Sequence, residues 1–159
     1  MKRRFSIFLM ILLLLAPINV VGLEKQGLTE NMGNNVEYLD ELSLDEKLEA
    51  EDVLVRFFDA QVLGDTGTIK TFLGGHLLKK REKLLNNPSY SDFLRKTYKN
   101  ARLEIIAYER LKENTIQIDT IILMNEQETI QVNFILVKES LPSNSSLSYR
   151  IHSQKVIGR

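Results

Sequence analysis

Cysteine is absent from the 159-residue chain, and histidine occurs only twice. The lack of cysteine excludes a disulfide framework, a thiolate nucleophile, a zinc–thiolate or iron–sulfur site, and a lipid-anchored cysteine at an exported N-terminus. The two histidines, His76 and His152, lie far apart and lack the short spacing of metal ligands in sequence motifs. We therefore expect no metal site and no cofactor.

An excess of charge of one sign is also lacking, because the formal net charge is zero. Apolar residues make up 43% and charged residues 26%, which is typical of soluble globular domains and excludes a disordered, collagenous or coiled-coil class for most of the chain. Residues 24–52 contain ten acidic and two basic residues, whereas residues 70–102 contain nine basic and two acidic ones. We interpret these runs as solvated helix faces, and nothing in the charge balance indicates a nucleic acid partner.

The N-terminus has the features of a secretory signal peptide. It begins with the basic sequence MKRR, continues with an apolar run over residues 5–16, and reaches Pro17 and then the small residue Gly22. This order predicts cleavage after Gly22, which removes residues 1–22 and exports the chain to the periplasm or the medium. The alternative is a retained membrane anchor formed by residues 5–21, a run at the lower limit of length for crossing a bilayer.

A single domain is expected over residues 43–159, after a flexible linker over residues 23–42 that shows little apolar periodicity. Ser43 and Glu46 have the spacing of a capping box, which predicts that a helix begins directly after the serine. Gly64 can adopt the left-handed conformation that ends a helix, so the first helix is predicted over about residues 44–63.

The apolar residues of this helix predict which of its faces packs on the core. Phe57 and Phe58 are adjacent and therefore lie about 100° apart, so that one can face a sheet and the other the neighbouring helices. The apolar residues of the predicted core face recur at helical spacing, and further apolar residues beside them widen this face. Its members are Leu44, Leu48, Val55 and Val62, widened by Leu54, Phe58 and Leu63.

Three shorter helices and then four strands are expected after Gly64. The helices are predicted over residues 66–73, 77–85 and from Ser89 or Ser91 to Tyr98, and the strands over 103–111, 115–124, 129–138 and 147–157. Short turns between successive strands indicate antiparallel pairing, so we expect an α+β fold in which N-terminal helices pack on one face of an antiparallel sheet of about four strands.

The third strand shows the clearest alternation of apolar and polar residues. Ile130, Val132, Phe134 and Leu136 share one face, which we expect to lie against the first helix. Gln131 and Asn133 point the other way and are expected on the outer face of the sheet.

A family resemblance is carried by three short features and the last strand. The features are the pair Phe57–Phe58, the turn Gly64–Asp65 and a short second helix over residues 69–73; the last strand has the sequence SYRIHSQKVI. Together they resemble the nuclear transport factor 2-like, or cystatin-like, superfamily over about residues 43–157. The resemblance implies that N-terminal helices pack on a curved, mostly antiparallel sheet, which wraps around the long helix and forms a cone with a pocket at its wider end. Because members include enzymes, ligand carriers and inert scaffolds, it does not assign a function.

No combination of residues has a diagnostic catalytic spacing, so we assign no catalytic residue. Carboxylates such as Asp52, Asp59 and Asp119 are expected to face solvent. The candidate ligand-binding residues in the implied cone are aromatic or titratable side chains, namely Phe58, His76, Tyr108, Tyr149 and His152.

Three classes of function remain open. The first is an exported non-catalytic module that holds a small apolar ligand or peptide in the cone. The second is a protein-interaction scaffold, associated with the membrane if the N-terminal segment is retained and able to form a homodimer through the outer sheet face. The third is an isomerase- or cyclase-like enzyme, in which a tyrosine stabilises an oxyanion.

Overall fold

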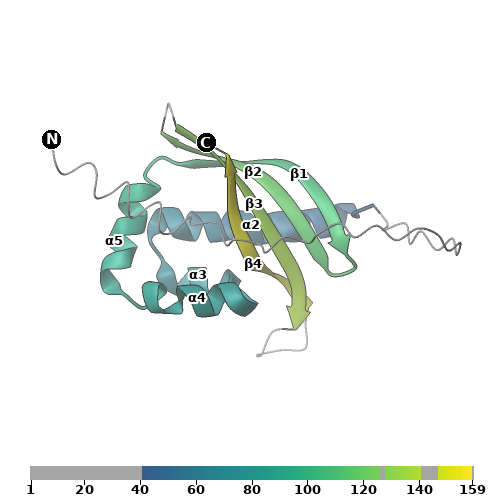
Figure 1. Cartoon of the computed structure of the whole chain (residues 1–159), viewed down its shortest axis with the longest axis horizontal. Helices are drawn as coiled ribbons and strands as arrows, with labels where there is room; N and C mark the ends of the chain where they lie inside the picture. Colours follow the sequence, from purple (N-terminus) through teal and green to yellow (C-terminus); the bar gives the residue numbers. More distant parts are fainter. Residues whose placement is uncertain (1–40, 126–127, 141–146, 159) are drawn as a thin grey trace, which may run out of the picture. The chain divides into compact units, whose positions relative to one another are not determined.

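The computed structural model describes residues 41–125, 128–140 and 147–158, so the predicted signal peptide and nearly all of the predicted linker lie outside the described residues. The described residues form an α+β fold in which four helices precede a four-stranded sheet (Figure 1). The helices are α2 (Leu44–Leu63), α3 (Thr66–Phe72), α4 (Gly75–Leu85) and α5 (Pro88–Thr97). The strands are β1 (Arg102–Lys112), β2 (Thr115–Asn125), β3 (Glu128–Ser140) and β4 (Leu147–Gly158). The predicted fold class is confirmed.

Both ends of α2 lie where the sequence predicts them. The Ser43 hydroxyl accepts a hydrogen bond from the Glu46 amide at 3.2 Å, and the Glu46 carboxylate accepts one from the Ser43 amide at 3.0 Å. This capping box satisfies two amides that the first turn leaves without helical partners. Gly64 ends the helix with φ +67°, and a Cβ there would lie 2.5 Å from the carbonyl oxygen of Ser91. Glycine is therefore required at this position by both conformation and space.

The predicted core face of α2 is wrong for five of its seven members, because Leu54 and Phe58 are buried as expected but the other five are not. Leu44, Leu48 and Val55 are 70%, 55% and 39% exposed. Apolar residues occur on two sides of α2, and the periodicity alone does not decide which side is buried. The side with two phenylalanines removes more apolar surface from water and therefore packs on the sheet. The buried residues of α2 are Ala50, Val53, Leu54, Phe57, Phe58, Ala60 and Gln61.

The start of α5 is also corrected. The helix begins at Pro88 instead of Ser89 or Ser91, and the side chain of Asn87 caps it by accepting from the Ser89 amide. Proline is well suited to the first helical position because the amide it lacks would have no helical partner there. Pro88, which lies between the two predicted helices, is therefore the first residue of the second one.

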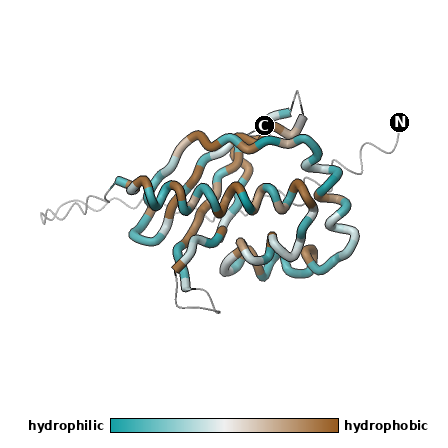
Figure 2. Tube along the Cα trace, turned by 180° about the vertical axis from the view of Figure 1, so that it is seen from behind, coloured by the Kyte–Doolittle hydropathy of each residue, from teal (hydrophilic) through white to brown (hydrophobic). Residues whose placement is uncertain are grey.

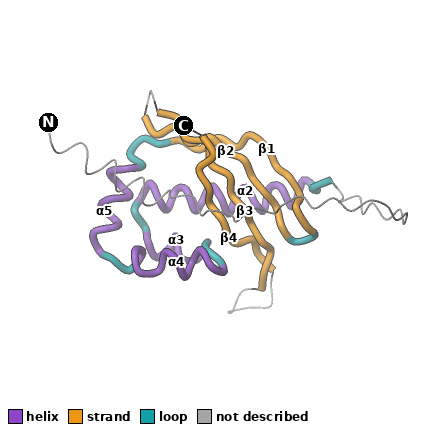
Figure 3. Tube along the Cα trace, in the orientation of Figure 1, coloured by secondary structure: helices purple, strands orange, loops and turns teal. Residues whose placement is uncertain are grey.

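The sheet has the order β1-β2-β3-β4 with antiparallel pairing throughout, and register shifts interrupt all three pairings. Such bulges bend and twist strands, which suits a sheet that follows a helix. One face is covered by α2, and no described helix lies over the other (Figures 1 and 3). The predicted inward residues of β3 are all buried and Gln131 is exposed, so the predicted register is confirmed.

The two phenylalanines of α2 divide between the sheet and the helices, as predicted. Phe57 packs edge-on against Phe134 of β3, with ring centroids 6.2 Å apart. Phe58 packs edge-on against Tyr98, which follows α5, at 5.9 Å. The core is therefore continuous from the sheet through α2 to the shorter helices.

Candidate functional site

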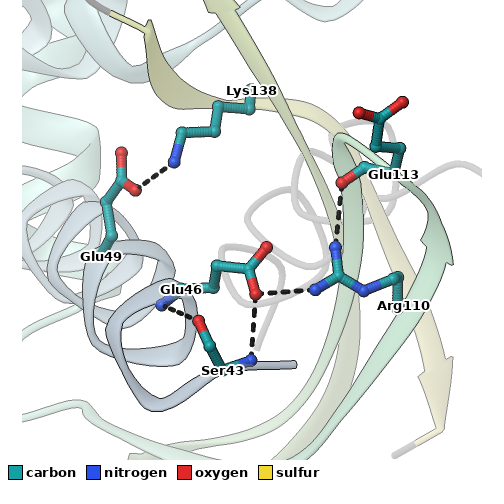
Figure 4. Close-up of polar contacts among 6 residues, drawn as sticks. All are labelled: Ser43, Glu46, Glu49, Arg110, Glu113 and Lys138. Atoms are coloured by element: carbon teal, nitrogen blue, oxygen red, sulfur yellow. Dashed lines mark hydrogen bonds and ion pairs between the residues drawn. The ribbon is translucent and has the colours of Figure 1, made fainter. Parts of the chain in front are cut away.

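Three glutamates in the first half of α2 bind side chains of the sheet. Glu46 pairs with Arg110 of β1 at 2.7 Å, and Glu49 pairs with Lys138 of β3 at 2.7 Å (Figure 4). Glu51 accepts a hydrogen bond at 2.9 Å from the hydroxyl of a β1 tyrosine. We call these three glutamates and their partners Arg110, Lys138 and Tyr108 the polar seam. The seam fixes the acidic start of α2 to two strands of the sheet.

Glu46 is the central residue of this seam. It completes the capping box of α2 and at the same time accepts from Arg110, whose guanidinium also donates to the carbonyl of Glu113 at 2.9 Å (Figure 4). The Arg110 hydrogen bond, followed by that of the Ser43 amide, lowers the pKa of Glu46 to about 2. The carboxylate is therefore ionised at every physiological pH and cannot serve as a proton donor.

Two tyrosines adjoin the same part of α2. Tyr149 of β4 is 2% exposed, and its hydroxyl is buried without a hydrogen-bond partner among the described residues. Burial raises its pKa to about 12, with a further contribution from the charges of Glu46 and Glu49. The Lys138 ammonium lies 5.2 Å from the centroid of the Tyr149 ring. Tyr149 is thus a neutral, buried donor next to paired charges.

Tyr108 has a different environment. It is half-buried on β1, and its hydroxyl donates to the Glu51 carboxylate. Burial, and then the hydrogen bond to Glu51, raises its pKa to about 12. The Tyr108 hydroxyl therefore already donates its hydrogen bond to Glu51, and an oxyanion would have to displace this carboxylate to accept the bond instead.

The two histidines lie in separate environments. His76 is exposed in the first turn of α4. His152 of β4 is partly buried, with Nε2 3.0 Å from the Glu139 carboxylate, and its ring lies so close to Gly74 and Gly75 that neither position could carry a Cβ without displacing it. No group of three or more His, Asp or Glu residues suited to a metal ion occurs in the described ranges.

Arg150 joins the histidine region to the helices. Its guanidinium donates at 2.6 Å to the carbonyl of Thr71 in the last turn of α3 and lies 3.8 Å from the Glu139 carboxylate. Leu73 forms a parallel bridge with Ile151, and the Gly74 amide donates to the Ile151 carbonyl at 3.0 Å. These contacts attach α3 and α4 to the free edge of β4, and they give Arg150 and the His152–Glu139 pair a structural explanation.

The five predicted ligand-binding residues are not brought together in one place. Phe58 packs against Tyr98, Tyr108 and Tyr149 adjoin the first half of α2, His152 lies against the Gly74–Gly75 pair, and His76 is exposed. Ligand binding by these residues stays a prediction. The polar seam was not foreseen, although Arg110 and Lys138 occupy inward positions of strands, where a charged residue indicates a buried partner.

The outer face of the sheet is mixed in character. Asn133 donates to the Asp119 carboxylate at 2.7 Å, which joins β3 to β2 across the uncovered surface. Half-buried apolar side chains surround this pair, among them Ile121 and Ile135. Asp119 lies opposite the buried positions of β2, as expected, and is partly exposed.

The described residues define a class of fold, an α+β domain of helices followed by an antiparallel meander. No family model and no curated protein matches the chain. Among solved structures, it is similar to a SEC-C motif-containing protein from Psychrobacter arcticus, with a TM-score of 0.52 and 18% sequence identity. The match covers 77% of this chain and 67% of that protein. At this identity the likeness shows the fold alone.

None of the helices in the described ranges is both long enough and apolar enough to cross a bilayer.

Proposed function

We propose that the chain is an exported, non-catalytic member of the nuclear transport factor 2-like superfamily that binds a protein partner through the outer face of its sheet. The contrast between the two faces of the sheet carries this proposal. On the inner face, Phe57, Phe134 and Leu136 are each at most 1% exposed, so side chains fill the space beneath α2. The outer face holds apolar side chains that no described helix covers, as in surfaces used for protein contacts (Figure 1).

A second copy of the chain fits the outer face as the partner, because the face can pack on its own copy. Glu104 and Glu109 lie on β1, Lys155 lies on β4, and Ile121 and Ile135 lie on the strands between them. In a two-fold pair of stacked sheets whose axis runs along the strands, β1 of one copy faces β4 of the other. The side of one copy that carries Glu104 and Glu109 then lies over the side of the other that carries Lys155, and Ile121 and Ile135 of both copies lie within the interface.

Light scattering over a range of chain concentrations tests this proposal. The wild type is expected to be dimeric at high concentration, and Ile135→Glu is expected to be monomeric because it would bury an unpaired charge at the centre of the interface. Leu48→Glu, on the opposite side of the molecule, is the control and should dimerise normally. A wild type that is monomeric throughout, or a dimer that survives Ile135→Glu, would contradict the proposal.

Export rests on the N-terminal sequence and has its own test. Mass spectrometry of the chain recovered outside the cytoplasm is expected to show a mature protein that begins near Leu23. An intact chain that begins at Met1 and is extracted only with membranes would instead support the anchored scaffold.

A small ligand is the second candidate, and the Tyr149 hydroxyl is the observation that favours it. A buried donor without a partner is costly, and a ligand or a bound water could accept its hydrogen bond. If nothing binds there, Tyr149→Phe should unfold at the same or a higher urea concentration. A loss of about 1 kcal/mol or more in the free energy of unfolding would reveal an acceptor for the hydroxyl.

A further inference from the structure

The side of α2 that faces away from the sheet carries a continuous apolar strip. Leu44, Leu48, Val55 and Val62 are separated by four, seven and seven positions, which places them within about 40° of one another around the helix. We call these four residues the α2 strip. At 1.5 Å per residue the strip is about 27 Å long.

The strip is open in the described part of the molecule. Leu44 and Leu48 are more than half exposed, Val55 is 39% exposed and Val62 is half-buried. From behind, α2 lies in front of the strands, and no other described element crosses it (Figure 2). Leucines exposed to this extent in one row are uncommon on a monomer and are typical of a surface that another chain covers.

An acidic row runs along one side of the strip. Asp45, Asp52 and Asp59 repeat at seven-residue intervals and are all exposed. Among the described residues, only Asp52 of this row pairs with a basic side chain, that of Arg56 at 3.4 Å in an exposed pair. An apolar strip beside a row of like charges at heptad spacing is the pattern by which a helix selects a partner helix.

The acidic row argues against a second copy as the occupant. In an antiparallel pair of α2 helices, equivalent flanks face each other, so three aspartates would meet three aspartates. In a parallel pair, the row would meet the opposite flank of α2, where Leu54 and Gln61 are buried against the domain. The basic helices α4 and α5 also do not match, because neither has a large exposed apolar residue among those described.

We propose that the α2 strip is the docking site for a basic amphipathic helix of a different protein. The partner helix places apolar residues on Leu44, Leu48 and Val55 and lysines or arginines opposite the aspartate row. This site is independent of the outer sheet face, because it lies on the other side of the molecule (Figures 1 and 2).

Two synthetic 18-residue helices test the proposal. Both carry leucines at heptad spacing and one tryptophan, and their flanking positions are lysine in one and glutamate in the other. The chain contains no tryptophan, so the fluorescence of the peptide alone reports binding. The lysine peptide is expected to bind at least about tenfold more tightly than the glutamate peptide at low salt, and less tightly as salt rises.

Three variants show whether binding uses this surface. Leu48→Glu should weaken binding of the lysine peptide about tenfold or more, whereas Ile157→Glu should leave it within about twofold. The two side chains are matched in exposure, at 55% and 54%. The double variant Asp52→Lys/Asp59→Lys should reverse the preference and favour the glutamate peptide. Because all of these positions are exposed, circular dichroism and thermal unfolding should confirm that each variant folds.

Several results would overturn the proposal. Equal binding of the two peptides, or binding that Leu48→Glu does not weaken, would show that the strip does not select a basic helix. Self-association that Leu48→Glu abolishes would assign the strip to a second copy. Binding to phosphatidylcholine vesicles that depends on Leu48 would assign it to a lipid surface.

Discussion

Replacing Glu46 by glutamine separates its two roles at the start of α2. A glutamine side-chain oxygen can still accept from the Ser43 amide and keep the capping box, but it cannot form the ion pair with Arg110. The two side chains of the pair are 12% and 26% exposed, so the pair is less screened than a surface ion pair. Exposed ion pairs contribute up to about 1 kcal/mol, and hydrogen bonds to charged groups contribute about 1.5–3 kcal/mol. We therefore expect Glu46→Gln to lower the free energy of unfolding by about 1–1.5 kcal/mol at pH 7.

The effect of Glu46→Gln should depend on pH in one direction. The pKa of Glu46 falls from 4.5, its ordinary value, to about 2 in the folded chain. A carboxylate whose pKa is lower in the folded than in the unfolded state stabilises the fold above the unfolded pKa, and this contribution disappears as pH falls through the folded pKa. The stability difference between wild type and variant should therefore be complete above about pH 5 and be lost between about pH 4.5 and pH 2.

Urea unfolding of both chains at pH 7, 5, 4, 3 and 2 measures this difference. Glu82→Gln, at an exposed position on α4, is the matched control and should stay within about 0.5 kcal/mol of wild type. A double-mutant cycle with Arg110→Met isolates the energy of the pair from the other contacts of the arginine. A difference that is near zero at pH 7, or that persists unchanged at pH 2, would refute the assignment of Glu46 as the ionised anchor of α2.

Three further predictions concern the fold. Ser43→Ala should lower stability by about 1 kcal/mol, and an unchanged urea midpoint would place the start of α2 elsewhere. Phe58→Ala should cost about 3–5 kcal/mol as a buried aromatic residue, whereas Gln131→Ala should stay within about 0.5 kcal/mol; calorimetry that finds equal losses would contradict the inner and outer faces of β3. Gly64→Ala should lower the free energy of unfolding by about 1–3 kcal/mol, because φ is +67° and a Cβ would meet the Ser91 carbonyl oxygen. An unchanged urea midpoint for this variant would exclude the tight packing of α5 on the turn.

The elements of the fold could be predicted because their signals are local. The capping box, the glycine after α2 and the alternation in β3 each depend on residues within a few positions of one another. Leu44 and Phe57 have similar hydrophobicity, so a local pattern could not decide which of their faces on α2 is buried. That choice depends on the volume the sheet offers, which is a property of the assembled domain.

The polar seam could not be predicted for a related reason. Glu46 and Arg110 lie 64 positions apart, so no spacing rule connects them. The sequence does place charged residues at the inward positions of β1 and β3, and such positions can be searched for acidic partners on a helix. The surroundings of His152 could not be predicted either. Its proximity to Gly74 and Gly75 depends on the parallel bridge between Leu73 and Ile151, which no sequence pattern indicated.

The order of elements along the chain determines when α2 can acquire its contacts. Glu49 and Lys138 are 89 positions apart, and Phe57 also meets its partner only in β3. By contrast, each hairpin of the sheet closes between neighbouring strands. During synthesis from the N-terminus, α2 therefore emerges long before the surface that buries it, and the core cannot close until β3 has been made. For an exported chain, as we propose this one to be, the late closure of the core delays folding until β3 has been made.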